Sequence, residues 1–189
     1  MYEVEVKVRA DHAAVERALG EHGADSLGAV VQEDTYYDAP HRDFAETDEA
    51  LRIRREWAGD RAEPESDDPT ARVTYKGPLL EAESKSREEF ETAVADGETM
   101  AAIVDRLGFD AAATVRKERE RFAVDGYTVT LDRVDGLGEF VEVETETEES
   151  DITAAREGAR DLLATLGLDP DEQIRTSYLG LLLDSSAEE

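Results

Sequence analysis

The sequence predicts an α+β fold in which about eight antiparallel strands close into a barrel and helices pack on its outside. Many short segments alternate strictly between polar and apolar residues, which is the period of a β-strand with two different faces. Turn signals join most of these segments directly, so consecutive strands are expected to be antiparallel neighbours. The segments are too many and too short for a layered α/β sheet, and the amphipathic helices between them need a sheet face to cover.

The first part of the chain contains the strand with the clearest alternation, residues 2–9, in which tyrosine and valine alternate with glutamate, lysine and arginine. Asp11 is a suitable N-cap for a helix that ends near Gly23. A polar loop at 58–70, rich in proline and acidic residues, separates two strands that are expected to form a hairpin. The further strands expected in this part are 29–37, 50–57, 71–76, which ends at Gly77-Pro78, and 84–90.

The second part of the chain begins with a helix at 98–107, whose apolar stripe stops at Gly108. The pair Asp125-Gly126 is a strong hairpin signal between two further strands. The strands are expected at 115–124, 127–134 and 138–147, and helices follow at 151–166 and 178–183.

The composition limits the classes of partner. At 189 residues the chain has room for one domain, predicted at 1–184, followed by a disordered acidic tail at 185–189. Its formal net charge of −27 repels phosphate groups, so neither nucleic acid nor a membrane surface is an expected partner. Cysteine is absent, which excludes thiolate chemistry, and no apolar run approaches the length of a membrane-spanning helix. Because no signal peptide is visible, a cytoplasmic location is expected.

Lysine is scarce among the cations, since only four of the 21 basic residues are lysines. An acid-rich, lysine-poor surface suits a cytoplasm with high salt, where screening weakens the repulsion between carboxylates. We therefore expect a halophilic source. On such a surface most acidic residues only bind water, so the few lysines are the better guide to function. They are Lys7, Lys76, Lys117 and Lys85, of which the last is expected to be a loop or strand-edge cation.

Charged residues recur on one side of each predicted strand. Glutamates alternate in the strands at 2–9 and 138–147, and basic residues alternate in those at 50–57, 71–76 and 115–124. Two geometries explain this pattern. In one the charged faces point to solvent, as in many exposed strands; in the other they line a hydrated interior while the apolar faces lie under the helices. The inward geometry is favoured, because the helices need an apolar outer sheet face and because three of the four lysines lie in the alternating rows.

An interior with cations on some walls and carboxylates on another suits a polyanion bound together with a hard divalent metal ion. The motif Glu3-x-Glu5-x-Lys7 matches the ExExK signature of the CYTH superfamily, the triphosphate tunnel metalloenzymes, and further segments resemble that family in the same order. These segments are DTYYD at 34–38, LRIR at 51–54, YKGP at 75–78, REE at 87–89, RKER at 116–119, the strand ending at Asp132, GLGEFVEVE at 136–144 and SYLGLL at 177–182. The resemblance implies an eight-stranded antiparallel tunnel, in agreement with the strand pattern.

The resemblance also implies a role for each matching position. The residues that would bind the triphosphate are Lys7, Arg52, Arg54, Lys76, Arg87, Lys117 and Arg119. The residues that would hold Mg²⁺ or Mn²⁺ are Glu5, Asp132, Glu142 and Glu144, with Glu3 nearby. The catalytic set implied is Glu3, Glu5, Lys7, Lys76 and Asp132. Phosphoryl chemistry depends mainly on positioning and charge stabilisation, so no Ser–His or Cys–His pair is required.

The order of the segments is most similar to archaeal proteins grouped with class IV adenylyl cyclases, and it leaves three functions open. The first is conversion of ATP to cyclic AMP and pyrophosphate. The second is hydrolysis of inorganic, thiamine or nucleoside triphosphate, and the third is binding of a triphosphate without catalysis. The bacterial cyclases of this family carry a His-Phe pair before the ExExK motif, whereas this chain has Met1-Tyr2 there, which weakens the cyclase interpretation. In each case the partner is ATP or another small triphosphate, and a homodimer is common among such proteins.

Overall fold

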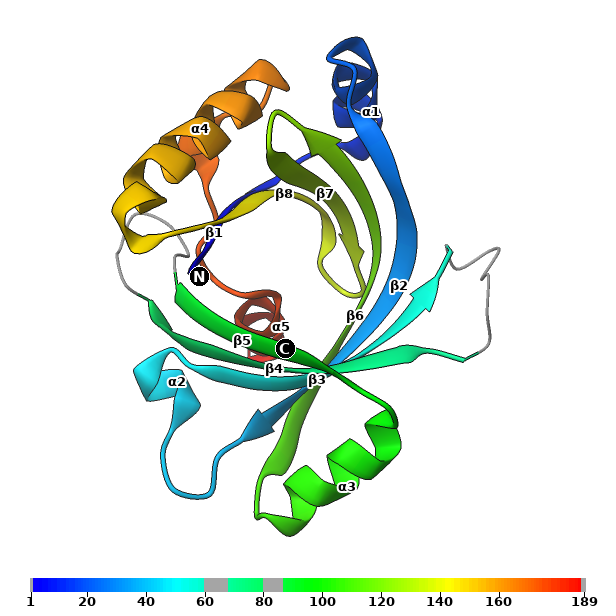
Figure 1. Ribbon diagram of the computed structural model, residues 1–189, viewed down its shortest axis with the longest axis vertical. Coiled ribbons are helices and arrows are strands. Elements are labelled where there is room, and N and C mark those ends of the chain that lie inside the picture. Colours follow the sequence, from blue (N-terminus) through cyan, green and yellow to red (C-terminus); the bar gives the residue numbers. More distant parts are fainter. Residues whose placement is uncertain (1, 60–67, 80–86, 188–189) are drawn as a thin grey trace.

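The computed structural model describes residues 2–59, 68–79 and 87–187. Within these ranges eight strands form one closed antiparallel barrel, which confirms the predicted fold class. The strands are β1 (Tyr2–Arg9), β2 (Asp25–Asp38), β3 (Ala50–Ala58), β4 (Thr70–Leu79), β5 (Arg87–Val94), β6 (Asp110–Val124), β7 (Tyr127–Val134) and β8 (Gly138–Thr147). Their order around the barrel is β1-β5-β4-β3-β2-β6-β7-β8, and β1 closes the ring by pairing with both β8 and β5 (Figure 1).

Three helices cover the outer surface of the barrel (Figure 1). They are α1 (His12–Glu21), α3 (Gly97–Arg106) and α4 (Ile152–Thr165), at the places where the apolar stripes predicted them. The short helix α2 (Phe44–Thr47) and the 3₁₀ turns Glu149–Asp151 and Pro170–Glu172 were not predicted. In the part of the chain that the structure describes, no helix has the length and apolar character needed to cross a bilayer.

The apolar faces of the strands lie outside the bore, beneath the helices. Val6 and Val8 of β1 are buried against Leu19 of α1 and Leu163 of α4. A second apolar cluster joins β2 and β3 to α3 through residues Tyr37, Ile53 and Val104. Because side chains alternate along a strand, the charged faces of the same strands must point into the bore. The sequence left two geometries open, and the structure has the one in which the charged faces point inward.

One end of the bore is filled by apolar side chains and by helix α5 (Tyr178–Ala187). Phe140 of β8 and Val134 of β7 lie in the inward rows and pack with Tyr178 at the start of this helix. Helix α5 is thus the exception to the rule that helices cover the outside, and Figure 1 shows it within the ring of strands.

Helix α5 also changes the prediction for the C-terminal residues. It continues to Ala187, so the first three residues of the predicted disordered tail at 185–189 are helical, and the last two lie outside the described residues. Leu181 and Leu182 anchor the helix against the apolar end of the bore. A helix that is fixed by tertiary contacts continues into Ser185 and Ser186, although serine has only a modest helical preference of its own.

Two strands differ from their predicted limits. Strand β4 does not end at Gly77-Pro78 but runs on to Leu79, with an irregular register after Lys76. Proline is tolerated there because a bulge does not need its missing N–H group. Strand β5 begins at Arg87 rather than at residue 84; the residues 84–86, like the central part of the predicted polar loop (60–67), lie outside the described ranges.

We predict that the packing of helix α4 against the strands contributes much of the stability of the barrel. Leu163 is fully buried, so Leu163→Ala should lower the free energy of unfolding by about 2–5 kcal/mol through lost burial and a cavity. The matched control is Leu107→Ala, since Leu107 is 67% exposed and should change the value by less than about 0.5 kcal/mol. Urea unfolding followed by circular dichroism measures both variants, and equal effects would contradict this packing.

Candidate functional site

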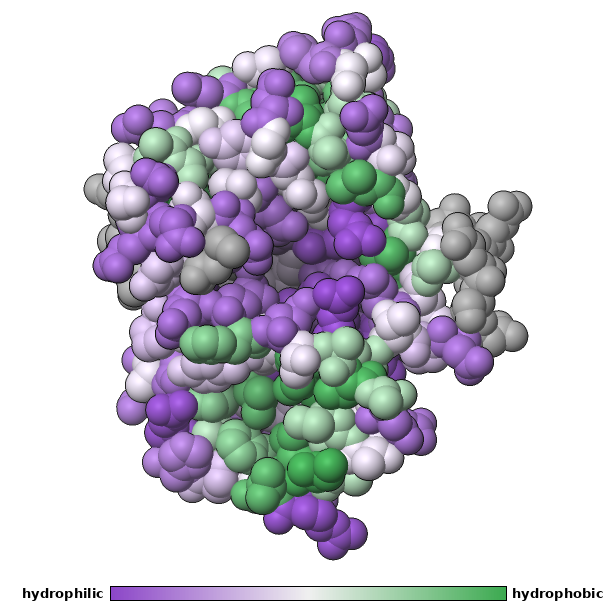
Figure 2. Space-filling model, viewed as in Figure 1, coloured by the Kyte–Doolittle hydropathy of each residue, from purple (hydrophilic) through white to green (hydrophobic). Residues whose placement is uncertain are grey.

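The bore contains a cavity of roughly 1810 Å³. Figure 2, in the same view as Figure 1, shows a hollow at the centre of the face, bordered by hydrophilic residues. The inward rows of β1, β3, β4, β5, β6 and β8 line the cavity, so its walls are charged while the outer faces of the same strands are apolar. The barrel therefore encloses a polar site within a small apolar shell.

All seven cations predicted to bind a triphosphate line this one cavity: Lys7, Arg52, Arg54, Lys76, Arg87, Lys117 and Arg119. Most are deeply buried, with at most 9% of the residue exposed, and the side chain of Lys76 is 19% exposed. Positive charges are costly to remove from water unless carboxylates or a bound anion compensate them. The structure thus brings together, from five strands, side chains that are far apart in the sequence.

The first compensating carboxylate is Asp34 of β2, which is fully buried. Arg54 donates two hydrogen bonds to it, at 2.6 Å and 2.8 Å, and Arg52 donates a third at 3.4 Å. The Nζ atom of Lys117 lies 3.6 Å from the same carboxylate. Burial alone would raise the pKa of Asp34, but the two guanidinium groups hold it well below its usual range. Asp34 therefore orients three of the candidate phosphate ligands.

The second compensating carboxylate is Asp132 of β7, which the sequence predicted to hold metal. Arg119 donates to both of its oxygens, at 2.7 Å and 2.5 Å, and the Tyr178 hydroxyl donates to one of them at 2.9 Å. Asp132 is fully buried behind Arg119 and is not among the residues that line the cavity. This placement differs from the predicted metal contact, because its two oxygens already accept hydrogen bonds inside the wall.

Glu142 of β8 lies between this buried pair and the cavity. Arg119 donates to Glu142 at 2.5 Å, and the Nζ atom of Lys7 lies 3.9 Å from its other oxygen. Burial and the nearby Glu5 would raise the pKa of Glu142, but Arg119 and Lys7 outweigh them and lower it. Glu142 is therefore ionised and tied to cations, although it lines the cavity as predicted.

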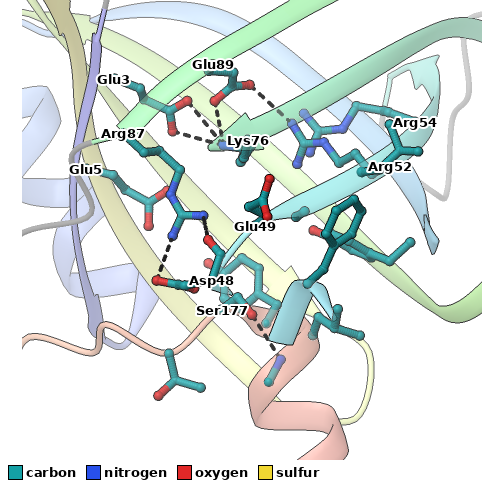
Figure 3. A pocket seen from close by; sticks show the side chains of 18 of the residues that line it. Glu3, Glu5, Asp48, Glu49, Arg52, Arg54, Lys76, Arg87, Glu89 and Ser177 are labelled. Carbon is teal, nitrogen blue, oxygen red and sulfur yellow. Dashed lines mark hydrogen bonds and ion pairs between the residues drawn. The ribbon is translucent and has the colours of Figure 1, made fainter. Parts of the chain in front are cut away.

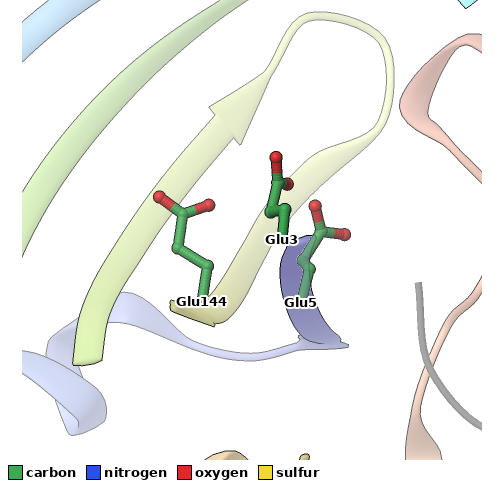
Figure 4. A group of neighbouring side chains, drawn as sticks. All are labelled: Glu3, Glu5 and Glu144. Carbon is green, nitrogen blue, oxygen red and sulfur yellow. The ribbon is translucent and has the colours of Figure 1, made fainter. Parts of the chain in front are cut away.

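Three glutamates form the group best suited to a metal ion: Glu3, Glu5 and Glu144. Each offers an oxygen, and these atoms lie within 4.8 Å of one another (Figure 4). The register of the sheet causes this, because Glu5 and Glu144 are direct partners across β1 and β8, and Glu3 follows on the same face. Three carboxylates this close repel one another, and carboxylate oxygens are the ligands that Mg²⁺ and Mn²⁺ prefer.

The pKa of Glu144 reflects this crowding. Burial raises the pKa of Glu144 to about 7, and the neighbouring Glu3, Glu142 and Glu5 add to the effect against the opposing influence of Arg119. At pH 7 a carboxyl group with a pKa of about 7 is half protonated, whereas an ordinary glutamate is fully ionised. A divalent cation at this position would remove the repulsion, so the residues present fit such an ion.

Lys76 of β4 lies between two carboxylates, as Figure 3 shows. Its Nζ atom is 2.7 Å from Glu89 and 3.2 Å from Glu3. Burial would lower the pKa of Lys76, but Glu3 and Glu89 outweigh it and raise the pKa, so this ammonium stays charged. Burial raises the pKa of Glu89 to about 7, helped by its hydrogen bond with Glu3. Lys76 therefore couples the carboxylates of β1 and β5.

Sequence reasoning missed Asp34 and Glu89 as parts of the site. Glu89 shares the inward row of Arg87, but the residue between them, Glu88, is charged rather than apolar, so the alternation in this strand is not clean. Asp34 lies within the DTYYD segment, which resembles the family but gives no role for this residue. Its signal was its position in register with Arg54, which becomes visible only when β2 and β3 are paired.

Arg87 lies where the cavity meets the segment that carries α2. Its guanidinium donates to the backbone oxygen of Asp48 at 3.0 Å and lies 3.6 Å from the Asp48 carboxylate. The next residue, Glu49, accepts hydrogen bonds from Tyr75 and Thr47 and pairs with Arg42 at 3.0 Å. These contacts fix the α2 segment at the cavity mouth (Figure 3).

Lys117 of β6 is a deeply buried cation whose pKa lies below its ordinary value. It is 3% exposed, and burial together with the nearby Arg119 lowers its pKa to about 8. Two aspartates in the wall oppose this effect without cancelling it. The site is therefore short of negative charge around Lys117, where a phosphate group would supply it.

Comparisons with known proteins agree with this geometry. The sequence matches the CYTH domain family over residues 1–178. A protein of Methanocaldococcus jannaschii named "putative adenylate cyclase" is 39% identical over 185 residues, which cover 96% of this chain and 98% of that protein.

Two solved structures have the same fold. One, from Pyrococcus horikoshii, has a TM-score of 0.86 and 38% identity, and the match covers 97% of this chain and 99% of the other. The other, a Hippeastrum protein described as a "putative adenylyl cyclase" with a dominant triphosphatase activity, has a TM-score of 0.63 and 18% identity, with 98% and 95% of the two chains covered. At that identity the Hippeastrum protein is evidence for the fold alone.

We predict opposite effects on stability from removing two of the buried lysines. Because the pKa of Lys117 falls from 10.5 to about 8 on folding, its charged form is disfavoured in the ligand-free protein. Lys117→Met should therefore raise the free energy of unfolding at pH 7, by roughly 1–3 kcal/mol. The unfolded chain binds more protons between these two values, so the wild type gains stability as pH rises through that window and the advantage of the variant shrinks.

The matched variant is Lys76→Met, which leaves Glu3 and Glu89 without the ammonium between them and should lower the thermal midpoint. Differential scanning calorimetry at constant salt, from pH 7 to pH 10, compares both variants with the wild type. A loss of stability in Lys117→Met as large as that in Lys76→Met would contradict the assignment of a shortage of negative charge around Lys117.

Proposed function

The chain belongs to the CYTH domain family, and from this premise we propose that it is a metal-dependent enzyme acting on a triphosphate held inside the barrel. One observation carries the proposal: seven cations, six of them buried, converge on a single cavity that also holds a group of three glutamates. A ligand for this cavity must be strongly anionic and able to share a divalent cation. A triphosphate meets both requirements, since it places negative oxygens along a chain that the cations can follow.

Six of the seven cations fall into three groups with different tasks. Arg52, Arg54 and Arg119 are held in place by Asp34 and Asp132, so their guanidinium forks are oriented before a ligand arrives. Preorganised donors stabilise the charge that develops during phosphoryl transfer without reorganising at that moment. Lys117 and Lys76 are point charges that add attraction, and Arg87 can exchange its contact with Asp48 for a phosphate oxygen.

The family implies dependence on a divalent metal ion, and we propose Mg²⁺ or Mn²⁺. Glu3, Glu5 and Glu144 would hold it, with Glu142 beside them. When bound, such an ion neutralises phosphate oxygens and polarises the phosphorus as a Lewis acid. Asp132, which was predicted as a further ligand, is assigned here to the orientation of Arg119.

We place the reaction first with class IV adenylyl cyclases. The 3′-hydroxyl of ATP would give up its proton to water and its oxygen would form a bond to the α-phosphorus. The bond from that phosphorus to the bridging oxygen would break, and pyrophosphate would leave. The name of the 39% identical archaeal relative supports this reaction. In this reaction the chain's own residues bind and orient the phosphates and keep bulk water away from them.

The second candidate is a triphosphatase, in which water attacks the terminal phosphorus of inorganic, thiamine or nucleoside triphosphate. The observation that favours it comes from the sequence, because Met1-Tyr2 stands where the bacterial cyclases of this family carry a His-Phe pair. The cations and carboxylates of the cavity serve both reactions, because they act on the phosphate chain and not on the attacking group.

Product analysis separates these candidates. The protein is incubated at high salt with Mn²⁺ or Mg²⁺ and with either ATP or tripolyphosphate. Cyclic AMP with pyrophosphate establishes the cyclase, and orthophosphate without cyclic AMP establishes the triphosphatase. Tight binding of triphosphate without turnover would leave a binding module and overturn the proposal of an enzyme.

We predict that two single substitutions each abolish turnover. Glu5→Gln removes one carboxylate of the metal group, and Lys76→Ala removes the ammonium between Glu3 and Glu89. Each should lower kcat/KM at least about 100-fold, as losses of charge-stabilising groups do. Glu148→Gln, an exposed change outside the cavity, is the control for charge removal. Circular dichroism confirms that each variant is folded at the assay temperature, and near-normal activity in both site variants would refute the assignment.

A further inference from the structure

Tyr178 is the first residue of helix α5, and it lies where this helix meets the charged part of the bore. The residue is 6% exposed and lines the cavity. Its ring packs edge-on against Phe140, with 5.0 Å between the two ring centroids. The segment before the helix is fixed as well, because the backbone N–H of Ile174 donates to the carbonyl oxygen of Lys7 at 2.7 Å. The ring therefore has a defined place beside strand β1.

The ring of Tyr178 faces two of the candidate phosphate ligands. The Nζ atom of Lys7 lies 4.2 Å from the ring centroid, and that of Lys117 lies 5.1 Å from it. Both lysines are buried, with 1% and 3% of the residue exposed. An ammonium group over an aromatic ring is attracted by the negative face of the ring, and the attraction is strongest where water is excluded. Tyr178 therefore compensates part of the charge of both lysines.

An aromatic ring compensates these charges without opposing an anionic ligand. Lys7 pairs with Glu142 at 3.9 Å and Lys117 pairs with Asp34 at 3.6 Å, and both distances are longer than a hydrogen bond. A further carboxylate in place of the ring would attract the ammonium groups more strongly, but it would also repel the oxygens of a phosphate. A neutral ring face attracts the cations and leaves their full charge available to a ligand.

The hydroxyl of Tyr178 acts on a third cation. It donates to Asp132 at 2.9 Å, and the same carboxylate accepts two hydrogen bonds from Arg119. Burial and the nearby Glu142 and Asp132 raise the pKa of Tyr178 well above its ordinary value, so the hydroxyl keeps the proton that it donates. Tyr178 therefore helps to orient Arg119 through Asp132.

We propose that Tyr178 is a positioning residue for the triphosphate. Its ring face holds the ammonium groups of Lys7 and Lys117 at the cavity wall, and its hydroxyl fixes the aspartate that orients Arg119. This inference rests on the proposed function and deepens it, because it makes helix α5 a part of the phosphate site in addition to filling one end of the bore.

The test measures binding of the imido-bridged analogue of tripolyphosphate, which resists hydrolysis, by isothermal titration calorimetry at constant salt and Mg²⁺. Tyr178→Leu removes the ring and should weaken binding at least about tenfold, because two buried ammonium groups lose its attraction. Tyr178→Phe keeps the ring and should weaken binding only about threefold, through the lost hydrogen bond to Asp132. The matched control is Leu181→Ala, which removes an apolar contact of helix α5 outside the cavity and should leave the affinity at its wild-type value.

A double-mutant cycle separates positioning from packing. In the Lys7→Met background the ring has lost one of its two cations, so Tyr178→Leu should weaken binding by a smaller factor than it does in the wild-type background. A ring that only packs would cause the same factor in both backgrounds, and that result would overturn the proposal. Circular dichroism confirms that each variant is folded at the temperature of the titration.

The outcomes separate this inference from the proposed function. If the wild type does not bind the analogue, the proposed function fails and this inference fails with it. If the wild type binds but Tyr178→Leu binds as tightly, or Leu181→Ala loses as much affinity, Tyr178 has no positioning role while the triphosphate tunnel stands. If Tyr178→Leu does not fold, Tyr178→Phe decides: weaker binding supports the proposal, and unchanged binding overturns it.

Discussion

The structure depends on keeping a set of charges buried inside a small barrel. Ionised groups are costly to remove from water, so the wall supplies a partner for most of them. Asp34 holds Arg52 and Arg54, and Asp132 holds Arg119 while it accepts a hydrogen bond from Tyr178. These buried pairs make the wall rigid, and they fix guanidinium groups in directions that point into the cavity. A tunnel of this kind can be built only if the apolar residues lie on the outside, where α1, α3 and α4 cover them.

Two ionisable groups in the wall, Lys117 and Glu144, are not fully compensated by opposite charges, and one is a cation and the other an acid. Lys117 has too little negative charge around it, and its pKa is lowered to about 8 by burial and by Arg119. Glu144 has too little positive charge around it, and its pKa is raised to about 7 by burial and by other glutamates. An anionic ligand would correct the first and a divalent cation would correct the second. The ligand-free site therefore gives up stability that the proposed metal–triphosphate complex would return on binding, a trade-off common in functional sites.

Sequence patterns predicted a large part of this arrangement. Strict alternation in β1 and β8, the Asp125-Gly126 turn and the amphipathic helices predicted the strands and their hairpins, because these signals are local, whereas the order β1-β5 and β2-β6 around the barrel was not predicted. The scarcity of lysine directed attention to Lys7, Lys76 and Lys117, which all line the cavity. The resemblance to a family then pointed to all seven cations and to Glu5, Glu142 and Glu144. Predictions about the compartment, the halophilic source and the single domain at 1–184 stay predictions.

The sequence by itself determined the strands, their alternating faces and the kinds of charge on each face, because these follow from a period of two residues and from local turn chemistry. Only the tertiary structure decided which side of the sheet is the interior, since a strand has the same alternation whichever face is buried. It also decided which carboxylates group together at the cavity and which accept hydrogen bonds inside the wall. Asp132 lies behind Arg119 and Glu3 joins Glu5 and Glu144, because register across neighbouring strands sets those distances. Helix α5 fills one end of the bore for the same reason: its partners come from β2, β6, β7 and β8, and β2 reaches the other three strands only through its long-range pairing with β6.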